Sequence, residues 1–175
     1  DTDRYYVVAA NVLGGCQGST GPASLAPDGA PWGSRFPVIS TRDQVYAESR
    51  LADLLGIDEW SIVVGASLGG HRAIEWAVSY PERVRRLVVV ASGAQTTADQ
   101  AAWTHTQIRA IELDPAWRGG DYYAGPGPTA GLALARQIAH TTYRSPSELD
   151  ERFGRIPQND EDPLRGGRLA VESYL

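Results

Sequence analysis

Ser67 is the side chain of this sequence best placed to act as a nucleophile. It is the centre of a Gly-x-Ser-x-Gly pentapeptide, residues 65–69, which follows the apolar run 62–64 and precedes a helix-forming stretch at 72–78. A strand, a tight turn and a helix in this order form a nucleophile elbow, in which the serine stands exposed on a strained turn. We therefore expect the glycines on either side of Ser67 to be required, because a Cβ there would collide with neighbouring backbone.

The backbone N–H of Leu68 is the predicted partner of Ser67 in catalysis. Leu68 begins the expected helix, where N–H groups have no intrahelical acceptor and the helix dipole favours negative charge. Such an N–H can stabilise the oxyanion that forms when a serine attacks a carbonyl carbon. The alternative interpretation is a glycine-rich turn without a chemical role, which the flanking strand and helix disfavour.

A second group of polar side chains lies on a predicted helix at 129–143. Arg136, His140 and Tyr143 are spaced i, i+4 and i+7, so they share one face of that helix. A guanidinium beside a phenol can bind a carboxylate if this face looks into a cleft. The alternative is a solvated helix face, and the pattern alone does not decide between the two.

The elements that would position these residues alternate between strands and helices. Buried strands are expected at 4–13, 62–64 and 84–91, and a helix with Thr41 as N-cap and Gln44 in a capping box is expected to end at Gly56. This alternation is typical of an α/β fold with a mostly parallel sheet. Ligands of such sheets bind beyond the carboxyl ends of the strands, which is where Ser67 falls.

After residue 94 the sequence changes from strands to helices. Helices are expected to begin after Thr97, to span 129–143, and to begin again after Ser145, whose Pro-x-Glu continuation is typical of a helix start. We therefore predict that residues 1–94 form part of the sheet-containing core and that residues 95–175 form a helical cap above it.

The composition excludes several classes of function. The 175 residues include 16 arginines and no lysine, which excludes a Schiff-base lysine and a Walker-type phosphate loop. The arginines are scattered, so nucleic-acid binding is not expected, and no apolar run reaches the ~18 residues of a membrane span. Cys16 is the only cysteine, and no metal site is expected. A cytoplasmic enzyme is the default expectation, and the lack of any methionine suggests a piece of a longer protein, lacking both ends.

Several stretches of the sequence resemble the homoserine O-acetyltransferase family of α/β-hydrolase-fold acyltransferases, in particular its actinobacterial members. The resemblance extends over essentially the whole chain, and the loop that begins at Asn11 is its most family-specific part. Leu68 stands where the family commonly has methionine, but the backbone N–H is what the chemistry uses. The similar stretches are residues 11–22, 32–37, 42–43, 65–70, 75–77, 119–123, 135–136, 140–143 and 171–175.

The resemblance implies a fold, a reaction and two binding residues. The fold would be an α/β-hydrolase-like sheet with a helical cap insertion, incomplete in this chain. Ser67 would take the acetyl group from acetyl-CoA, a cosubstrate, and pass it to the hydroxyl of L-homoserine in a ping-pong reaction of methionine biosynthesis, with no tightly bound cofactor. Arg136 would bind the homoserine carboxylate, Tyr143 would line the same pocket, and the protein would form a homodimer through the cap.

The base and acid that would complete a catalytic triad are not expected in this chain. In the family the Asp and His follow the cap, and the loop that supplies a second oxyanion N–H lies upstream. His71, His105 and His140 are poor substitutes by position, and His140 is expected to pack or to support the binding face. We therefore predict that these 175 residues alone do not catalyse acyl transfer.

Four other readings of the sequence stay open. The same chemistry could use succinyl-CoA as donor or L-serine as acceptor, because a few pocket side chains decide such preferences. An esterase would use water in place of the amino-acid hydroxyl. A fragment without activity could require a second polypeptide to complete its fold.

Overall fold

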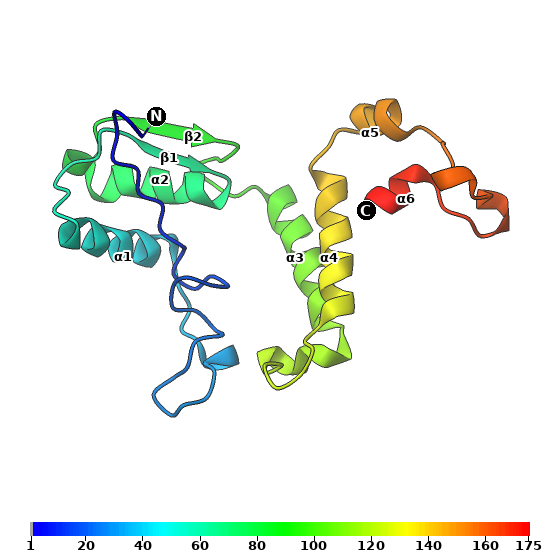
Figure 1. The fold of residues 1–175 in the computed structure, drawn as a ribbon, viewed down its shortest axis with the longest axis horizontal. Coiled ribbons are helices and arrows are strands. Elements are labelled where there is room, and N and C mark those ends of the chain that lie inside the picture. Colours follow the sequence, from blue (N-terminus) through cyan, green and yellow to red (C-terminus); the bar gives the residue numbers. More distant parts are fainter. Residues whose placement is uncertain (1) are drawn as a thin grey trace. The chain divides into compact units, whose positions relative to one another are not determined.

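The computed structural model describes residues 2–175, which form two compact units that meet in sequence between Thr96 and Thr97 (Figure 1). The first unit contains a parallel pair of strands, β1 (Val63–Ala66) and β2 (Leu87–Val90). Val63 lies opposite Leu87 and Ala66 opposite Val90, so both strands end at the same edge. The residues that follow the strands are therefore neighbours at that edge.

Helix α2 (Leu68–Ser79) connects the two strands and packs against both of them. Its other side contacts helix α1 (Thr41–Leu54), so that α2 lies between the sheet and α1 (Figure 1). The core where these elements meet consists of Val45, Ala52 and Trp76, with Trp60 and Tyr80 packed around them. The predicted α/β organisation of this part of the chain is confirmed.

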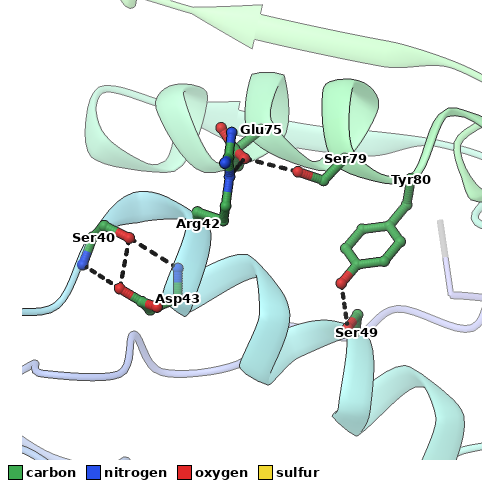
Figure 2. Close-up of polar contacts among 7 residues, drawn as sticks. All are labelled: Ser40, Arg42, Asp43, Ser49, Glu75, Ser79 and Tyr80. Carbon is green, nitrogen blue, oxygen red and sulfur yellow. Dashed lines mark hydrogen bonds and ion pairs between the residues drawn. The ribbon is translucent and has the colours of Figure 1, made fainter.

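Polar contacts join α1 to α2 beside this core (Figure 2). Arg42 pairs with Glu75 at 2.9 Å, and the Ser79 hydroxyl donates to the same carboxylate at 2.7 Å. The hydroxyls of Ser49 and Tyr80 are 3.2 Å apart. These two sets of contacts fix α2, and with it the turn that precedes it, against α1.

The capping box of α1 lies one residue earlier than predicted. Ser40, and not Thr41, is the N-cap: its hydroxyl accepts from the Asp43 N–H, and the Asp43 carboxylate accepts from the Ser40 N–H at 2.8 Å. Gln44 instead donates to the Leu13 carbonyl. The predicted helix end is confirmed, because Gly56 follows the C-cap Leu55 with a φ of +69°.

The predicted strand at 4–13 is wrong for this chain. The segment from Tyr5 to Val12 has no strand pairing, and Tyr6 is 75% exposed. Burial on both faces is also wrong for the other two strands, since Val64 is 63% and Val90 51% exposed. A strand is stable only with neighbours to hydrogen-bond and to cover its faces, and the sheet here is incomplete.

The second unit is built around an antiparallel helix pair, α3 (Ala98–Glu112) and α4 (Thr129–Thr142) (Figure 1). The helices approach closely at Gly131, where a Cβ would lie 2.6 Å from the carbonyl oxygen of Ala110. Asp114 fastens the same point: its carboxylate accepts from the N–H groups of Ala116 and Gly131, both at 2.9 Å. The capping box of Thr97 and Gln100 and the span of α4 are as predicted.

Shorter helices complete the chain. Ser145 caps α5 (Pro146–Phe153), which ends at Gly154 as predicted, and α6 (Ala170–Tyr174) packs against α5. Across residues 2–175, none of the helices combines the length and apolar character needed to cross a membrane. The 3-10 helices are η1 (Gly33–Arg35), η2 (Pro81–Arg83), η3 (Pro115–Gly120), η4 (Gln158–Asp160) and η5 (Pro163–Arg165).

Candidate active site

Ser67 occupies the turn between β1 and α2 and has the backbone of a strained elbow. Its φ of +53° and ψ of −123° lie in a region that residues with a Cβ rarely adopt. Such a conformation costs about 1–3 kcal/mol and persists only where the surroundings hold it. The side chain is exposed and does not cap the helix that it precedes, so the hydroxyl faces outward. The predicted strand–turn–helix order is confirmed.

The glycines around Ser67 are not equivalent. A Cβ on Gly65 would lie 1.9 Å from the carbonyl oxygen of Gly69, so residue 65 must be glycine for the turn to close. A Cβ on Gly69 would meet nothing within 4 Å, and the prediction that residue 69 is crowded is wrong. The crowded glycine after Ser67 is Gly70, where a Cβ would lie 2.1 Å from the Ser92 hydroxyl oxygen.

Leu68 is the first residue of α2, and its N–H belongs to the peptide group that follows Ser67. N–H groups of the first helical turn have no acceptor within the helix. They also carry the positive end of the helix dipole, so they favour an anion placed beside them. The geometry is therefore suited to the predicted oxyanion-stabilising role of this N–H.

A half-buried charged cluster anchors α2 close to the elbow. The Glu48 carboxylate pairs with Arg72, and it accepts from the Trp76 indole N–H at 2.8 Å. Burial lowers the pKa of the Arg72 guanidinium from its usual high value, although an arginine stays charged at neutral pH. The cluster fixes the elbow helix one turn beyond Ser67 without contacting the reacting hydroxyl.

The second unit carries the predicted binding face on α4. Arg136 is exposed, and within residues 2–175 no carboxylate pairs with it. Tyr143, the C-cap of α4, is 72% exposed, and its ring lies 6.1 Å from that of His140. His140 is half-buried and packs 5.3 Å from the ring of Tyr174. Arg136 and Tyr143 therefore remain accessible, whereas His140 packs between helices.

No histidine hydrogen-bonds to the Ser67 hydroxyl in the part of the chain that the structure describes. His71 is half-buried on α2, and the rings of His105 and His140 belong to the second unit. The same part of the chain holds no cluster of three or more His, Cys, Asp or Glu side chains arranged for a metal ion. Ser67 and Leu68 belong to one unit and Arg136 and Tyr143 to the other, and the prediction that Ser67 faces Arg136 stays a prediction.

Sequence reasoning missed one residue of the elbow, Ser92. Its hydroxyl donates to the Ser67 carbonyl at 2.5 Å from the end of β2. The signal was present, because Ser92 follows a predicted strand parallel to β1, and the carboxyl ends of such strands lie side by side.

Comparisons with known proteins agree with this arrangement. Residues 1–170 match the family model of the alpha/beta hydrolase fold. The chain is 63% identical to a homoserine O-acetyltransferase of Thermobifida fusca, and the match covers 100% of this chain and 47% of that protein. The resemblance to the homoserine O-acetyltransferase family is thus confirmed, and the chain spans about half the length of the curated relatives it matches.

Two solved structures show the same fold. Esterase E22 superposes with a TM-score of 0.84 at 32% identity, over 99% of this chain and 50% of that one. A homoserine O-acetyltransferase from Bacillus anthracis superposes with a TM-score of 0.78 at 28% identity, over 89% of this chain and 42% of that one. With its strained serine elbow between a parallel strand and a helix, the chain belongs to the α/β-hydrolase fold family.

Proposed function

We propose that this chain carries the nucleophile and the acceptor-binding face of a homoserine O-acetyltransferase. The observation that carries the proposal is the exposed Ser67 hydroxyl on a strained turn at the N-terminus of α2. The 63% identity to a homoserine O-acetyltransferase supports the choice of reaction. Residues 1–94 would be part of the core and residues 95–175 the cap of a cytoplasmic enzyme of methionine biosynthesis.

In the first half-reaction the Ser67 oxygen attacks the thioester carbonyl of acetyl-CoA. The new C–O bond forms as the carbonyl becomes an oxyanion, which the Leu68 N–H stabilises. The oxyanion then collapses, the C–S bond breaks, and CoA leaves as a thiol with the proton that Ser67 gave up. A histidine base from outside residues 1–175 would carry that proton, oriented by an acid that also lies outside them.

In the second half-reaction the hydroxyl of L-homoserine attacks the acetyl-serine ester and gives its proton to the same histidine base. The resulting oxyanion collapses, the C–O bond to Ser67 breaks, and the Ser67 oxygen takes the proton back as O-acetylhomoserine leaves. Arg136 would hold the homoserine carboxylate, because it is exposed and has no carboxylate partner among the described residues. Tyr143, two helical turns further along α4, would line the same pocket. The cap would also form a homodimer, and no tightly bound cofactor would be needed. Succinyl-CoA as donor and L-serine as acceptor are the nearest variants of this chemistry.

The test is mass spectrometry of the full-length gene product after mixing with acetyl-CoA. We expect one acetyl group on Ser67, which L-homoserine then removes as O-acetylhomoserine. Ser67→Ala should lose the mass shift, and turnover should fall by at least about 10³-fold. Ser61→Ala, which removes an exposed serine hydroxyl of the same unit, should leave both unchanged. Acetylation that persists in Ser67→Ala would refute the assignment.

A second candidate is an ester hydrolase, which the similarity to esterase E22 favours. Both enzymes would form the same acetyl-serine, so they differ in what removes the acetyl group. Release of acetate in the absence of homoserine, at the rate seen in its presence, would identify the hydrolase. Release of CoA that depends on homoserine would identify the transferase.

A further inference from the structure

The strained backbone of Ser67 is held by the end of strand β2. The Ser67 N–H donates to the Val90 carbonyl at 3.0 Å, which continues the strand pairing by one residue. The Ser67 carbonyl accepts from the Ser92 hydroxyl at 2.5 Å. The two polar groups of one backbone residue are thus bound by two residues that flank Ala91.

The chain at Ala91 is itself in an unusual conformation. Its φ is +50°, in the region that favours glycine, although the residue has a Cβ. Ala91 directly follows β2 and precedes Ser92, whose hydroxyl contacts the Ser67 carbonyl in the elbow. The strained Ser67 is therefore hydrogen-bonded to the residue that follows a second strained residue, Ala91. Backbone strain of this kind is often found at functional sites.

Gly70 provides the space that the Ser92 side chain occupies. A Cβ at residue 70 would lie 2.1 Å from the Ser92 oxygen and 2.5 Å from its Cβ. The elbow helix thus approaches Ser92 more closely than any residue with a side chain would allow. The contact therefore requires a hydroxyl at residue 92 and a glycine at residue 70.

The carbonyl that Ser92 binds belongs to the same peptide group as the Leu68 N–H. A peptide group is planar and trans, so its carbonyl and its N–H point in opposite directions. A donor that fixes the Ser67 carbonyl therefore fixes the direction of the Leu68 N–H. A hydrogen bond to a carbonyl also polarises the amide, which strengthens the N–H as a donor.

We infer that Ser92 is a positioning residue that aims the Leu68 N–H at the developing oxyanion. The inference rests on the proposed function of Ser67 and Leu68. Ser92 does not touch the substrate; it acts through the peptide group between Ser67 and Leu68. The N–H groups of Gly70 and His71 also donate to the Ser67 carbonyl, at 2.9 and 3.3 Å, so the loss of Ser92 weakens the positioning without abolishing it.

The test compares Ser92→Ala with Ser92→Thr in the full-length gene product. We expect Ser92→Ala to slow the acylation of Ser67 roughly tenfold, less than the 10²–10³-fold loss of removing an oxyanion donor outright. The KM for acetyl-CoA should not change, because the lost interaction acts in the transition state. Ser92→Thr keeps the hydroxyl and should restore most of the rate. Ser61→Ala is the matched control, because it removes an exposed serine hydroxyl of the same unit, and it should acylate at the wild-type rate.

Equal rates for Ser92→Ala and wild type would overturn the inference, and so would equal losses in Ser92→Ala and Ser92→Thr. If Ser92→Ala does not fold, Ser92→Cys supplies the comparison, because a thiol of similar size is a weak donor. Acylation by p-nitrophenyl acetate separates this inference from the proposed function. A wild-type protein that reacts with this ester but not with acetyl-CoA would refute the transferase, while the Ser92 series would still test the positioning.

Discussion

The Ser67 elbow and the Arg136 face are built in different ways. The elbow is defined by backbone: two strained residues, a glycine that no side chain can replace, and hydrogen bonds to both polar groups of Ser67. The Arg136 face is defined by exposed side chains on an otherwise regular helix. A turn fixed by backbone contacts has its shape before any ligand arrives, whereas exposed side chains form a binding site only when other surfaces enclose them.

The largest effect that this difference predicts is at Gly65. Gly65→Ala places a Cβ 1.9 Å from the Gly69 oxygen and 2.3 Å from the Gly69 carbonyl carbon, both of which are backbone atoms that cannot move aside. We expect a loss of at least about 3 kcal/mol in the free energy of unfolding, or failure to fold. Chemical denaturation of the full-length protein measures it.

Gly69→Ala is the matched control for this substitution. It adds the same methyl group four residues later, in open space within α2. Alanine is favoured over glycine within a helix, so we expect a gain of about 0.5–1 kcal/mol. Equal losses from the two variants would show that the elbow is not held by the close approach at Gly65.

The next largest effect separates the two regions kinetically. Arg136→Ala should remove a charge-assisted hydrogen bond to the acceptor carboxylate, worth about 1.5–3 kcal/mol, and lower kcat/KM for homoserine by roughly 10- to 100-fold. The rate of Ser67 acetylation should stay at the wild-type value, because the elbow does not depend on this side chain. Stopped-flow release of CoA and steady-state turnover measure the two steps separately.

Arg165→Ala provides the control for the loss of a positive charge from the second unit. Arg165 is 88% exposed in its side chain and lies in η5, away from α4 in sequence. Arg165→Ala should leave both the acetylation of Ser67 and the transfer to homoserine unchanged. If Arg136→Ala slowed acetylation as much as it slowed transfer to homoserine, the arginine would not be an acceptor-binding residue.

The same contrast explains what could be predicted from sequence. The elbow, the Thr97 and Ser145 caps and the Gly56 helix end depend on residues a few positions apart, so local patterns identify them. The strand at 4–13 failed because strand formation depends on partners elsewhere in the sequence. An apolar run indicates that its burial would be favourable, but it does not show that neighbouring strands are present to bury it.

Ser92 shows the limit most clearly. Its hydroxyl lies against the Ser67 carbonyl, 25 residues away in sequence. The parallel strands indicate that the two residues lie at the same edge of the sheet, but not that they are hydrogen-bonded. Gly69 and Gly70 show a related limit. The sequence shows both glycines, but it does not show that only a Cβ at residue 70 would collide with another side chain. The residues that sequence identifies are those proposed to carry the chemistry, and the residue that it misses is one that holds them in place.

The smallest predicted effect is on the pH dependence of stability, and it concerns one hydrogen-bonded carboxylate in each unit. Hydrogen bonds from Arg42 and Ser79 lower the pKa of Glu75 in the first unit, and hydrogen bonds from the Gly131 and Ala116 N–H groups lower the pKa of Asp114 in the second. A carboxyl whose pKa is lower in the folded state stabilises the fold above its unfolded pKa. That contribution is lost as the pH falls from about 4 through the folded pKa.

We therefore expect the melting temperature to fall as the pH is lowered below about 4, and each substitution to flatten this dependence. Asp114→Asn should act on the second unit and Glu75→Gln on the first, and the two losses should add, because the two carboxylates share no hydrogen-bond partner. Asp150→Asn removes an exposed carboxylate of α5 that caps no helix and should leave the acid dependence intact. Thermal melts between pH 3 and 7, followed in parallel for the wild type, the three single variants and the Asp114→Asn, Glu75→Gln double variant, test this. A profile that keeps its full slope in the Asp114→Asn, Glu75→Gln double variant would mean that other groups drive the acid transition and that neither carboxylate fastens its unit.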